Sequence, residues 1–128
     1  MRIFKVRVFA RFQRREGLRD GALRRAVRDA EAGLIDADLG GGLIKQRVAR
    51  AGQGKRGGYR TIIAYRAADR AVFLFGFAKS EKDDLEPGEL RNLMKIGVGW
   101  LRAEDDLIDA ALEDDRLTEM DYGHEDEN

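Results

Sequence analysis

Three patterns in the sequence predict an α+β domain in which helices pack on one mainly antiparallel sheet. Residues 59–67 and 71–79 are rich in β-branched and aromatic side chains and are separated by a three-residue turn, which is typical of an antiparallel hairpin. Residues 2–8 alternate between polar and apolar side chains, as a strand does. After residue 87, apolar residues recur at helical spacing. The predicted order is an N-terminal strand, two helices, a three-stranded antiparallel meander and a C-terminal helix.

The N-terminal part is predicted to contain one strand and two helices. In RIFKVRV, residues 2–8, Ile3, Lys5 and Arg7 share one strand face, and we expect only the opposite, apolar face to be buried. A short helix over residues 9–16 is predicted to end at Gly17. A second helix carries its apolar stripe at helical spacing and is expected to stop at Gly33. The residues of that stripe are Leu23, Ala26, Val27 and Ala30.

The central part is predicted to form the meander. LIDADLGGG, residues 34–42, is expected to be a loop, and LIKQRVAR, residues 43–50, a strand with Lys45 and Arg47 on one face. The last strand, residues 71–79, is predicted to place three phenylalanines on a common face. Those residues are Phe73, Phe75 and Phe77.

The C-terminal part begins with Pro87, which suits a first helical position. The apolar stripe that follows predicts a helix to about residue 102 that packs on the sheet, and residues 107–112 predict a second short helix. MDYGHEDEN, residues 120–128, has little to bury and is expected to be mobile. We therefore divide the chain into a domain over residues 1–103 and an acidic extension over residues 104–128, which is partly helical and then mobile.

The charge distribution is strongly asymmetric although the net charge is zero. Residues 1–82 hold 20 Lys and Arg against 8 Asp and Glu, a balance of +12, and residues 83–128 hold 4 against 16, a balance of −12. A basic body is what a polyanion-binding protein requires, although an arginine-rich solvated surface has the same composition. The acidic extension could fold onto the basic part and compete with RNA, so that deleting residues 104–128 would strengthen RNA binding at low salt.

Composition excludes several other classes. The chain has no cysteine, which excludes disulfides and thiolate metal sites and agrees with a reducing cytoplasm. No apolar run approaches the length of a membrane span, and the N-terminus lacks the apolar core of a signal peptide. We expect no metal, because residues 39–68 contain none of the clustered Asp or Glu that metal-dependent cleavage needs. We also expect no cofactor.

The stretch GQGKRGGYR, residues 52–60, concentrates four glycines and three cations. It matches G-x-G-x-x-G, but a strand follows it where a dinucleotide site needs a helix, and Arg56 stands where a P-loop needs Ser or Thr. A loop that binds a nucleic-acid backbone and a plain hairpin remain as alternatives. The first is favoured by the adjacent cations Lys55 and Arg56 and by Tyr59, whose ring could stack on a base.

Further cations are predicted to converge on this loop if the three strands pair in order. The sheet would then have one apolar face under the helices and one cationic groove. The cations expected around the groove are Lys45, Arg47, Arg50, Arg60, Lys79 and Lys82.

The stretch LGGGLIKQRVARAGQGKRGGYR, with FAKSEK after it, resembles the RelE/ParE-type toxins of bacterial toxin–antitoxin pairs. It is most similar to the HigB-like branch, with a GGxxKxRxxxxGxGKxGGYR core and an F-x-K-x-x-K ending, and the resemblance covers roughly residues 2–102. It implies a small microbial ribonuclease-like α+β fold. It also implies an mRNA interferase, that is, a ribosome-dependent mRNA endoribonuclease that inhibits translation, with a cognate antitoxin, the ribosome and mRNA as partners.

The resemblance implies cleavage through the ribose 2′-hydroxyl, and this sequence must supply the groups for it. Arg60 is our candidate to clamp the scissile phosphate, since a guanidinium binds two oxygens and stays charged. Lys45 and Lys79 are candidates for proton transfer, because crowding by cations favours a neutral lysine. Arg47 and Lys55 would hold flanking phosphates. The contacts expected to bind RNA outside this catalytic set come from Arg50, Arg56, Tyr59 and Lys82.

Two alternative functions remain, and the residue that donates a proton to the leaving oxygen is not yet assigned. A ParE-like gyrase inhibitor would share the fold without cutting RNA, and a non-catalytic module could use the groove to bind nucleic acid. The phosphate clamp favours the endonuclease, because a gyrase inhibitor needs none. Tyr122 and His124 are the late residues that could replace the tyrosine or histidine of other members, and both fall in the acidic tail.

Overall fold

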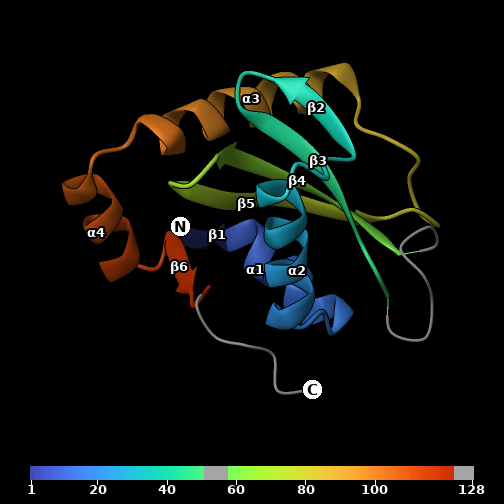
Figure 1. Ribbon diagram of the computed structural model, residues 1–128, viewed down its shortest axis with the longest axis horizontal. Coiled ribbons are helices and arrows are strands. Elements are labelled where there is room, and N and C mark those ends of the chain that lie inside the picture. Colours follow the sequence, from blue (N-terminus) through green and yellow to red (C-terminus); the bar gives the residue numbers. More distant parts are fainter. Residues whose placement is uncertain (51–57, 123–128) are drawn as a thin grey trace.

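A computed structural model describes residues 1–50 and 58–122, which build a six-stranded sheet with helices on both faces (Figure 1). The strands are β1 (Arg2–Val6), β2 (Ala37–Gly40), β3 (Leu43–Val48), β4 (Tyr59–Arg66), β5 (Arg70–Ala78) and β6 (Leu117–Met120). The helices are α1 (Arg7–Glu16), α2 (Asp20–Glu31), α3 (Pro87–Arg102) and α4 (Asp105–Glu113). The α+β class predicted from the sequence is confirmed.

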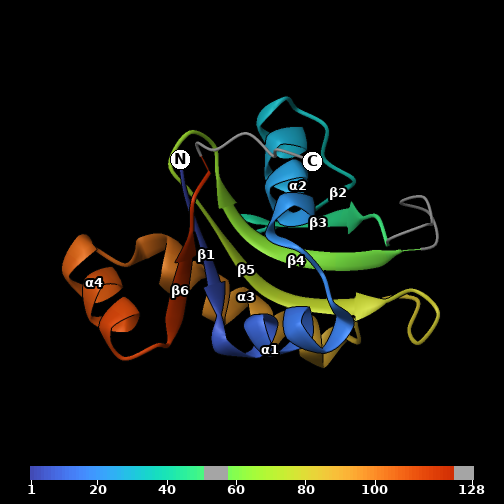
Figure 2. The same cartoon turned by 90° about the horizontal axis from the view of Figure 1, so that it is seen from below.

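The sheet order is β2-β3-β4-β5-β1-β6 (Figure 2). The predicted meander β3-β4-β5 is confirmed as two antiparallel pairs. β1 lies parallel to β5, and β6 pairs antiparallel with β1 at the edge. Two strands were not predicted: β2, which falls in the expected loop 34–42, and β6, which follows α4.

Helices cover both faces of the sheet, so the core has two layers. α1 and α2 pack on one face and α3 on the other, with α4 beside β6 (Figure 1). Ile3 belongs to the first layer and its neighbour Phe4 to the second, and both are fully buried. The prediction that strand 2–8 buries only one face is therefore wrong. The predicted division into one apolar face under the helices and one cationic groove is wrong for the same reason, because apolar helix surfaces pack on both faces of the sheet.

The N-terminal strand is shorter than predicted, since Arg7 and Val8 already belong to α1. Phe9 and Phe12 anchor this helix, with the Phe9 ring centroid 5.0 Å from that of Phe73 in β5. Burial of these rings outweighs the short polar and apolar alternation of the preceding residues. The predicted end at Gly17 is confirmed, and its φ of 67° is a left-handed conformation that glycine adopts without strain.

A β-bulge separates the phenylalanines that were predicted to share a face. Ile62 of β4 pairs with Phe75 and Ile63 pairs with Phe73, so one extra residue stands in β5 at this point. Phe73 consequently belongs to the layer under α1 and α2, whereas Phe75 and Phe77 belong to the layer under α3.

Helix α3 begins and ends as its sequence requires. Pro87 is its first residue, and Glu86 and Glu89 form a reciprocal capping box. Leu93, Gly97 and Leu101 are its buried residues, which agrees with the predicted stripe.

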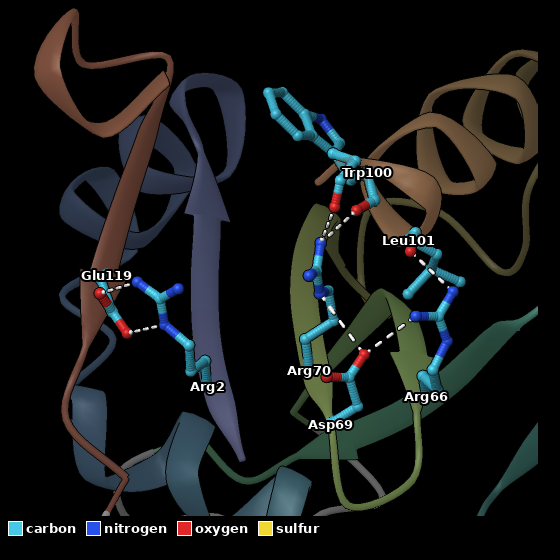
Figure 3. Close-up of polar contacts among 8 residues, drawn as sticks. Arg2, Arg66, Asp69, Arg70, Trp100, Leu101 and Glu119 are labelled. Carbon is cyan, nitrogen blue, oxygen red and sulfur yellow. Dashed lines mark hydrogen bonds and ion pairs between the residues drawn. The ribbon is translucent and has the colours of Figure 1, made fainter. Parts of the chain in front are cut away.

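Arginines from the β4–β5 hairpin bind the C-terminal end of α3 (Figure 3). Arg70 Nη1 donates to the carbonyl oxygens of Trp100 and Ala103 at 2.9 and 2.8 Å, and Arg66 Nη2 donates to that of Leu101 at 2.6 Å. Cations at this end complement both the unpaired carbonyls and the helix dipole. They fix α3 across the sheet.

The residues after α3 join the same core. The predicted short helix is confirmed as α4, and Ile108 of α4 and Leu117 of β6 are buried in the layer under α3. Arg2 and Glu119 form two side-chain hydrogen bonds of 2.9 Å between β1 and β6 (Figure 3). Met120, which was expected to be mobile, is buried in β6.

Candidate nucleic-acid interface

Four cations gather at one end of the sheet face that α3 covers, and we call them the sheet-face cluster: Lys45, Arg47, Arg60 and Lys79. Arg47 pairs directly with Arg60 across β3 and β4, and Arg60 pairs with Phe77 of β5. Lys79 lies two residues beyond Phe77, and its backbone N–H still bonds to the carbonyl of Gly58 at 3.2 Å. Strand alternation therefore places Lys45, Arg47 and Arg60 on the same face, and the bond to Gly58 holds Lys79, the first residue after β5, at the same end of the sheet. The convergence of these cations agrees with the sequence expectation.

The two arginines of the cluster differ in exposure. Arg47 is exposed, whereas Arg60 is only 8% exposed, and its Nη1 donates to the carbonyl of Tyr59 at 3.5 Å. A cation that is largely withdrawn from water interacts more strongly with an anion than an exposed one does. Arg60 is thus the more strongly desolvated charge, and Arg47 the more accessible one.

Lys45 has a carboxylate partner that the sequence did not suggest. Its Nζ lies 3.1 Å from Oδ1 of Asp84, in the segment between β5 and α3. The backbone N–H of Leu85 and then Lys45 itself hold the pKa of Asp84 below its usual value. The expectation that only cations crowd Lys45 is wrong, because the chain after β5 returns an acid to this lysine.

The two lysines after β5 are also different from each other. Lys79 is exposed and has no charged partner among the residues that the structure describes. Lys82 forms an ion pair of 2.5 Å with Glu89, and this bond, with that from the Glu86 backbone, lowers the pKa of Glu89. Lys82 therefore lies beside the cluster but is occupied by a carboxylate of α3.

Two residues predicted to bind RNA lie on the opposite face of the sheet. Tyr59 is 2% exposed, and its ring packs edge-on against Phe12 with the Arg50 guanidinium 5.3 Å from the ring centre. Burial, followed by a hydrogen bond with Glu16, raises the pKa of Tyr59. A base-stacking platform needs an exposed ring face. The predicted stacking role of Tyr59 is therefore wrong in this structure, and Arg50 belongs to a different surface from Arg47.

Three residues singled out from the sequence, namely Lys55, Arg56 and His124, lie outside the described residues. Tyr122 is described, and it packs at the edge of the first core layer with the Arg28 guanidinium 5.8 Å from its ring centre. That position is on the α2 side of the sheet, so Tyr122 does not meet the sheet-face cluster.

Asp84 and Glu89 are the site residues that sequence reasoning missed. Both come from SEKDDLEPGE, the acidic stretch that begins two residues after Ala78. Acidic residues directly after β5 could have indicated that the chain turns back there and brings carboxylates to lysines of the cationic face. The arrangement gives a cationic face whose outer lysines are held by acids and whose exposed cations, Arg47 and Lys79, can contact phosphates.

The described residues contain no group of three His, Cys, Asp or Glu side chains placed to hold a metal ion. Within the same residues, none of the helices has the length and apolarity that crossing a bilayer requires.

A family model described as "RelE toxin of RelE / RelB toxin-antitoxin system" matches residues 1–120. The chain therefore belongs to the RelE toxin family, as a toxin of a toxin–antitoxin system whose partner is an antitoxin protein. The match includes α4 and β6, and so extends beyond the limit near residue 102 that the sequence resemblance suggested.

Proposed function

We propose that this toxin is a ribosome-dependent mRNA endonuclease of the HigB-like branch, acting in the cytoplasm. The observation that supports this most is the gathering of Lys45, Arg47, Arg60 and Lys79 on one end of one sheet face. Such a density of cations on adjacent strands suits a polyphosphate chain. Ribosome and mRNA are its proposed partners besides the antitoxin.

In the proposed reaction the ribose 2′-oxygen attacks the adjacent phosphorus and the bond from phosphorus to the 5′-oxygen breaks. The 2′-hydroxyl loses its proton to a base, and the departing 5′-oxygen gains one. Negative charge grows on the phosphoryl oxygens between these events. Arg60 is the proposed clamp for that charge, because its largely buried guanidinium acts where water screens it least. Arg47, which is exposed beside it, is proposed to hold a flanking phosphate.

Lysines are the proposed proton carriers. Lys79 is exposed and has no charged partner among the described residues, so its ammonium can reach a bound RNA. Lys45 must first leave Asp84, since the two atoms are 3.1 Å apart. We therefore assign proton transfer first to Lys79 and give Lys45 the second place. Lys55, proposed with Arg47 for flanking phosphates, rests on the sequence alone.

The test is a translating extract to which purified toxin is added, with mRNA 5′ ends mapped by primer extension. The variants are Arg47→Ala, Arg60→Lys and Lys79→Ala. Lys95→Ala, on the exposed side of α3, is the control for the two alanine variants, since it removes one positive charge as each of them does. We expect cuts inside codons that require ribosomes. Arg60→Lys should reduce cutting about a hundredfold or more, since lysine keeps the charge but cannot bind two oxygens. Lys95→Ala should cut normally.

Absence of cuts with translation unaffected would exclude the endonuclease, and a supercoiling assay would then test gyrase inhibition. Cuts that persist in all three cluster variants would exclude the cluster as the site. Gradual loss of RNA affinity without any cutting would indicate a non-catalytic binding module.

A further inference from the structure

A cavity of about 750 Å³ lies on the sheet face opposite to the sheet-face cluster. Four arginines from three parts of the chain line it: Arg19, Arg24, Arg25 and Arg50. We call it the arginine pocket. Arg19 precedes α2, Arg24 and Arg25 lie in α2, and Arg50 follows β3, so the pocket depends on the tertiary fold.

The two carboxylates of the pocket, Glu16 and Asp20, already have partners, and one partner of Glu16 is Arg50 of the pocket itself. Asp20 accepts bonds from Lys5 Nζ at 3.0 Å and from Gln13 Nε2 at 2.7 Å. Glu16 lies 3.7 Å from Arg50 and 3.6 Å from Arg15. Four arginines therefore face two carboxylates that are both occupied, and the pocket keeps an excess of positive charge.

Two of the arginines are available to a ligand. Arg19 and Arg25 are exposed and have no charged partner among the residues that the structure describes. Arg24 differs, since it donates to the carbonyl of Asp121 at 3.2 Å, and Arg50 lies over the ring of Tyr59. The last two are thus fixed in place, while Arg19 and Arg25 can turn toward a bound anion.

The lining chemistry favours phosphates over a protein. Interfaces with proteins are usually anchored by large apolar side chains. In the described part of the chain the exposed large apolar residues are Val8, Leu34, Ile35, Ile96 and Leu107, and none of them lines the pocket. Guanidinium groups without apolar anchors suit phosphate oxygens, which they bind in pairs.

The pocket and the sheet-face cluster flank the same end of the sheet. Arg47 points to the α3 side of β3, and Arg50, three residues later, lines the pocket on the α2 side. Three residues span at most about 10 Å. In β4 the neighbours Tyr59 and Arg60 likewise face the pocket and the cluster. A polyanion that passes around this end of β3 and β4 can therefore contact both surfaces.

We infer that the arginine pocket is a second RNA-binding surface, which holds backbone phosphates of an RNA segment apart from the one at the sheet-face cluster. The inference rests on the proposed function in one respect, namely that the polyanion bound by the pocket is RNA. It does not require that the protein cut RNA.

The test measures binding of a short, fluorescent, fully 2′-O-methylated RNA, which has no free 2′-hydroxyl and cannot be cut. The full chain is compared with Arg19→Gln/Arg25→Gln and with the control Lys95→Gln/Arg102→Gln, which removes two exposed charges from α3. Because all four side chains are exposed, both double variants should keep the melting temperature of the parent. Fluorescence anisotropy over a range of salt gives the affinity and the salt slope.

We expect Arg19→Gln/Arg25→Gln to weaken RNA binding about tenfold at low salt and to reduce the salt slope by about 1 to 2, as the loss of two phosphate contacts does. The control should change affinity less than about twofold by the same reasoning. Equal effects of both double variants would overturn the inference, because net charge alone would then explain them.

Two further probes separate the sources of anion. The first probe is AMP or inorganic phosphate. Suppose that it binds the parent tightly, and that Arg19→Gln/Arg25→Gln abolishes this binding but leaves RNA affinity unchanged. The pocket is then a site for small anions, and the inference fails. It also fails if only binding of poly-glutamate is lost, since the surface is then one for acidic protein. If the parent toxin does not cut mRNA in the extract but still binds RNA through the pocket, the proposed function is overturned and this inference stands.

Discussion

Lys45 Nζ lies 3.1 Å from Asp84 Oδ1. This ion pair links the middle of β3 to the acidic segment that leads into α3. The carboxylate is 65% exposed and the lysine side chain 20% exposed, so the pair lies at the rim of the sheet-face cluster. An exposed pair contributes little to stability. If RNA binds the sheet-face cluster as proposed, the pair matters for binding, because Asp84 occupies a cation that would otherwise be available to a phosphate.

Replacing Asp84 by Asn should therefore strengthen RNA binding with little effect on stability. Lys45 would become available to phosphates, and one negative charge would leave the rim. We expect affinity for 2′-O-methylated RNA to rise about two- to tenfold at low salt and the gain to fade at high salt. The free energy of unfolding should change by less than about 1 kcal/mol.

The control for this variant is Asp106→Asn, which removes the same charge from the exposed face of α4. It should leave RNA affinity nearly unchanged. Equal gains in both variants, measured by anisotropy at several salt concentrations, would show that the overall charge and not the Lys45 partner sets the affinity.

A second prediction concerns the buried Lys5, which is 8% exposed and whose Nζ bonds to Gln13 at 2.9 Å and to Asp20 at 3.0 Å. Burial acts to raise the pKa of Asp20, but the hydrogen bonds from Gln13 and Lys5 together outweigh it, and the pKa is lowered. Because the folded pKa lies below the unfolded one, this carboxylate stabilises the fold above the unfolded value of 3.8 and loses that effect as the pH falls through the folded pKa.

Asp20→Asn should then destabilise the protein near pH 7 by about 1–3 kcal/mol, because it leaves the lysine without its charge partner. The exposure of the Asp20 side chain, 43%, places the effect toward the lower end. Urea unfolding of parent and variant should show this difference shrinking as the pH falls below about 5. A difference that stays constant down to strongly acidic pH would contradict the assignment.

Two glycines of α3 offer a matched pair for testing how closely the helix approaches the sheet. A methyl group at Gly97 would lie 2.6 Å from Leu43 Cδ1 and 3.1 Å from Leu74 Cδ1, whereas one at Gly99 would meet nothing within 4 Å. Gly99→Ala should stabilise the protein by about 0.5–1 kcal/mol through helix propensity. Gly97→Ala should destabilise it by about 1–3 kcal/mol, because the core must shift. Equal effects in chemical unfolding would show that α3 can move away from β3 freely.

The meander and the helices could be predicted because their signals are local. The hairpin of β4 and β5 has dense β-branched and aromatic residues, and the stripe of α3 repeats over four turns. β6 could not be predicted, since LTEM is four residues long and its burial follows from pairing with β1, more than a hundred residues away. The bulge in β5 was also invisible, because it depends on the partner strand β4.

The candidate site, like the fold, could be predicted from the sequence only in part. Strand alternation placed Lys45 and Arg47 on one face correctly, and pairing in order brought Arg60 and Lys79 to them. The same alternation sends Tyr59 to the opposite face, which its neighbour Arg60 already implied. The ion pair of Lys45 with Asp84 required knowledge of how the segment after β5 turns, which no local pattern gives.

The last prediction concerns truncation of the acidic end of the chain. Removing residues 104–128 would delete α4 and β6, expose the edge of β1 and uncover Phe4, so that variant should fail to fold rather than bind RNA more tightly. Removing residues 123–128 takes away Glu125, Asp126 and Glu127 and leaves β6 intact. The shorter truncation should keep the parent's melting temperature. It should also increase affinity for 2′-O-methylated RNA at low salt, because three like charges repel the backbone. A folded, cooperative variant lacking residues 104–128 would contradict the role of β6, and unchanged low-salt affinity after the shorter truncation would show that these acids do not act on bound RNA.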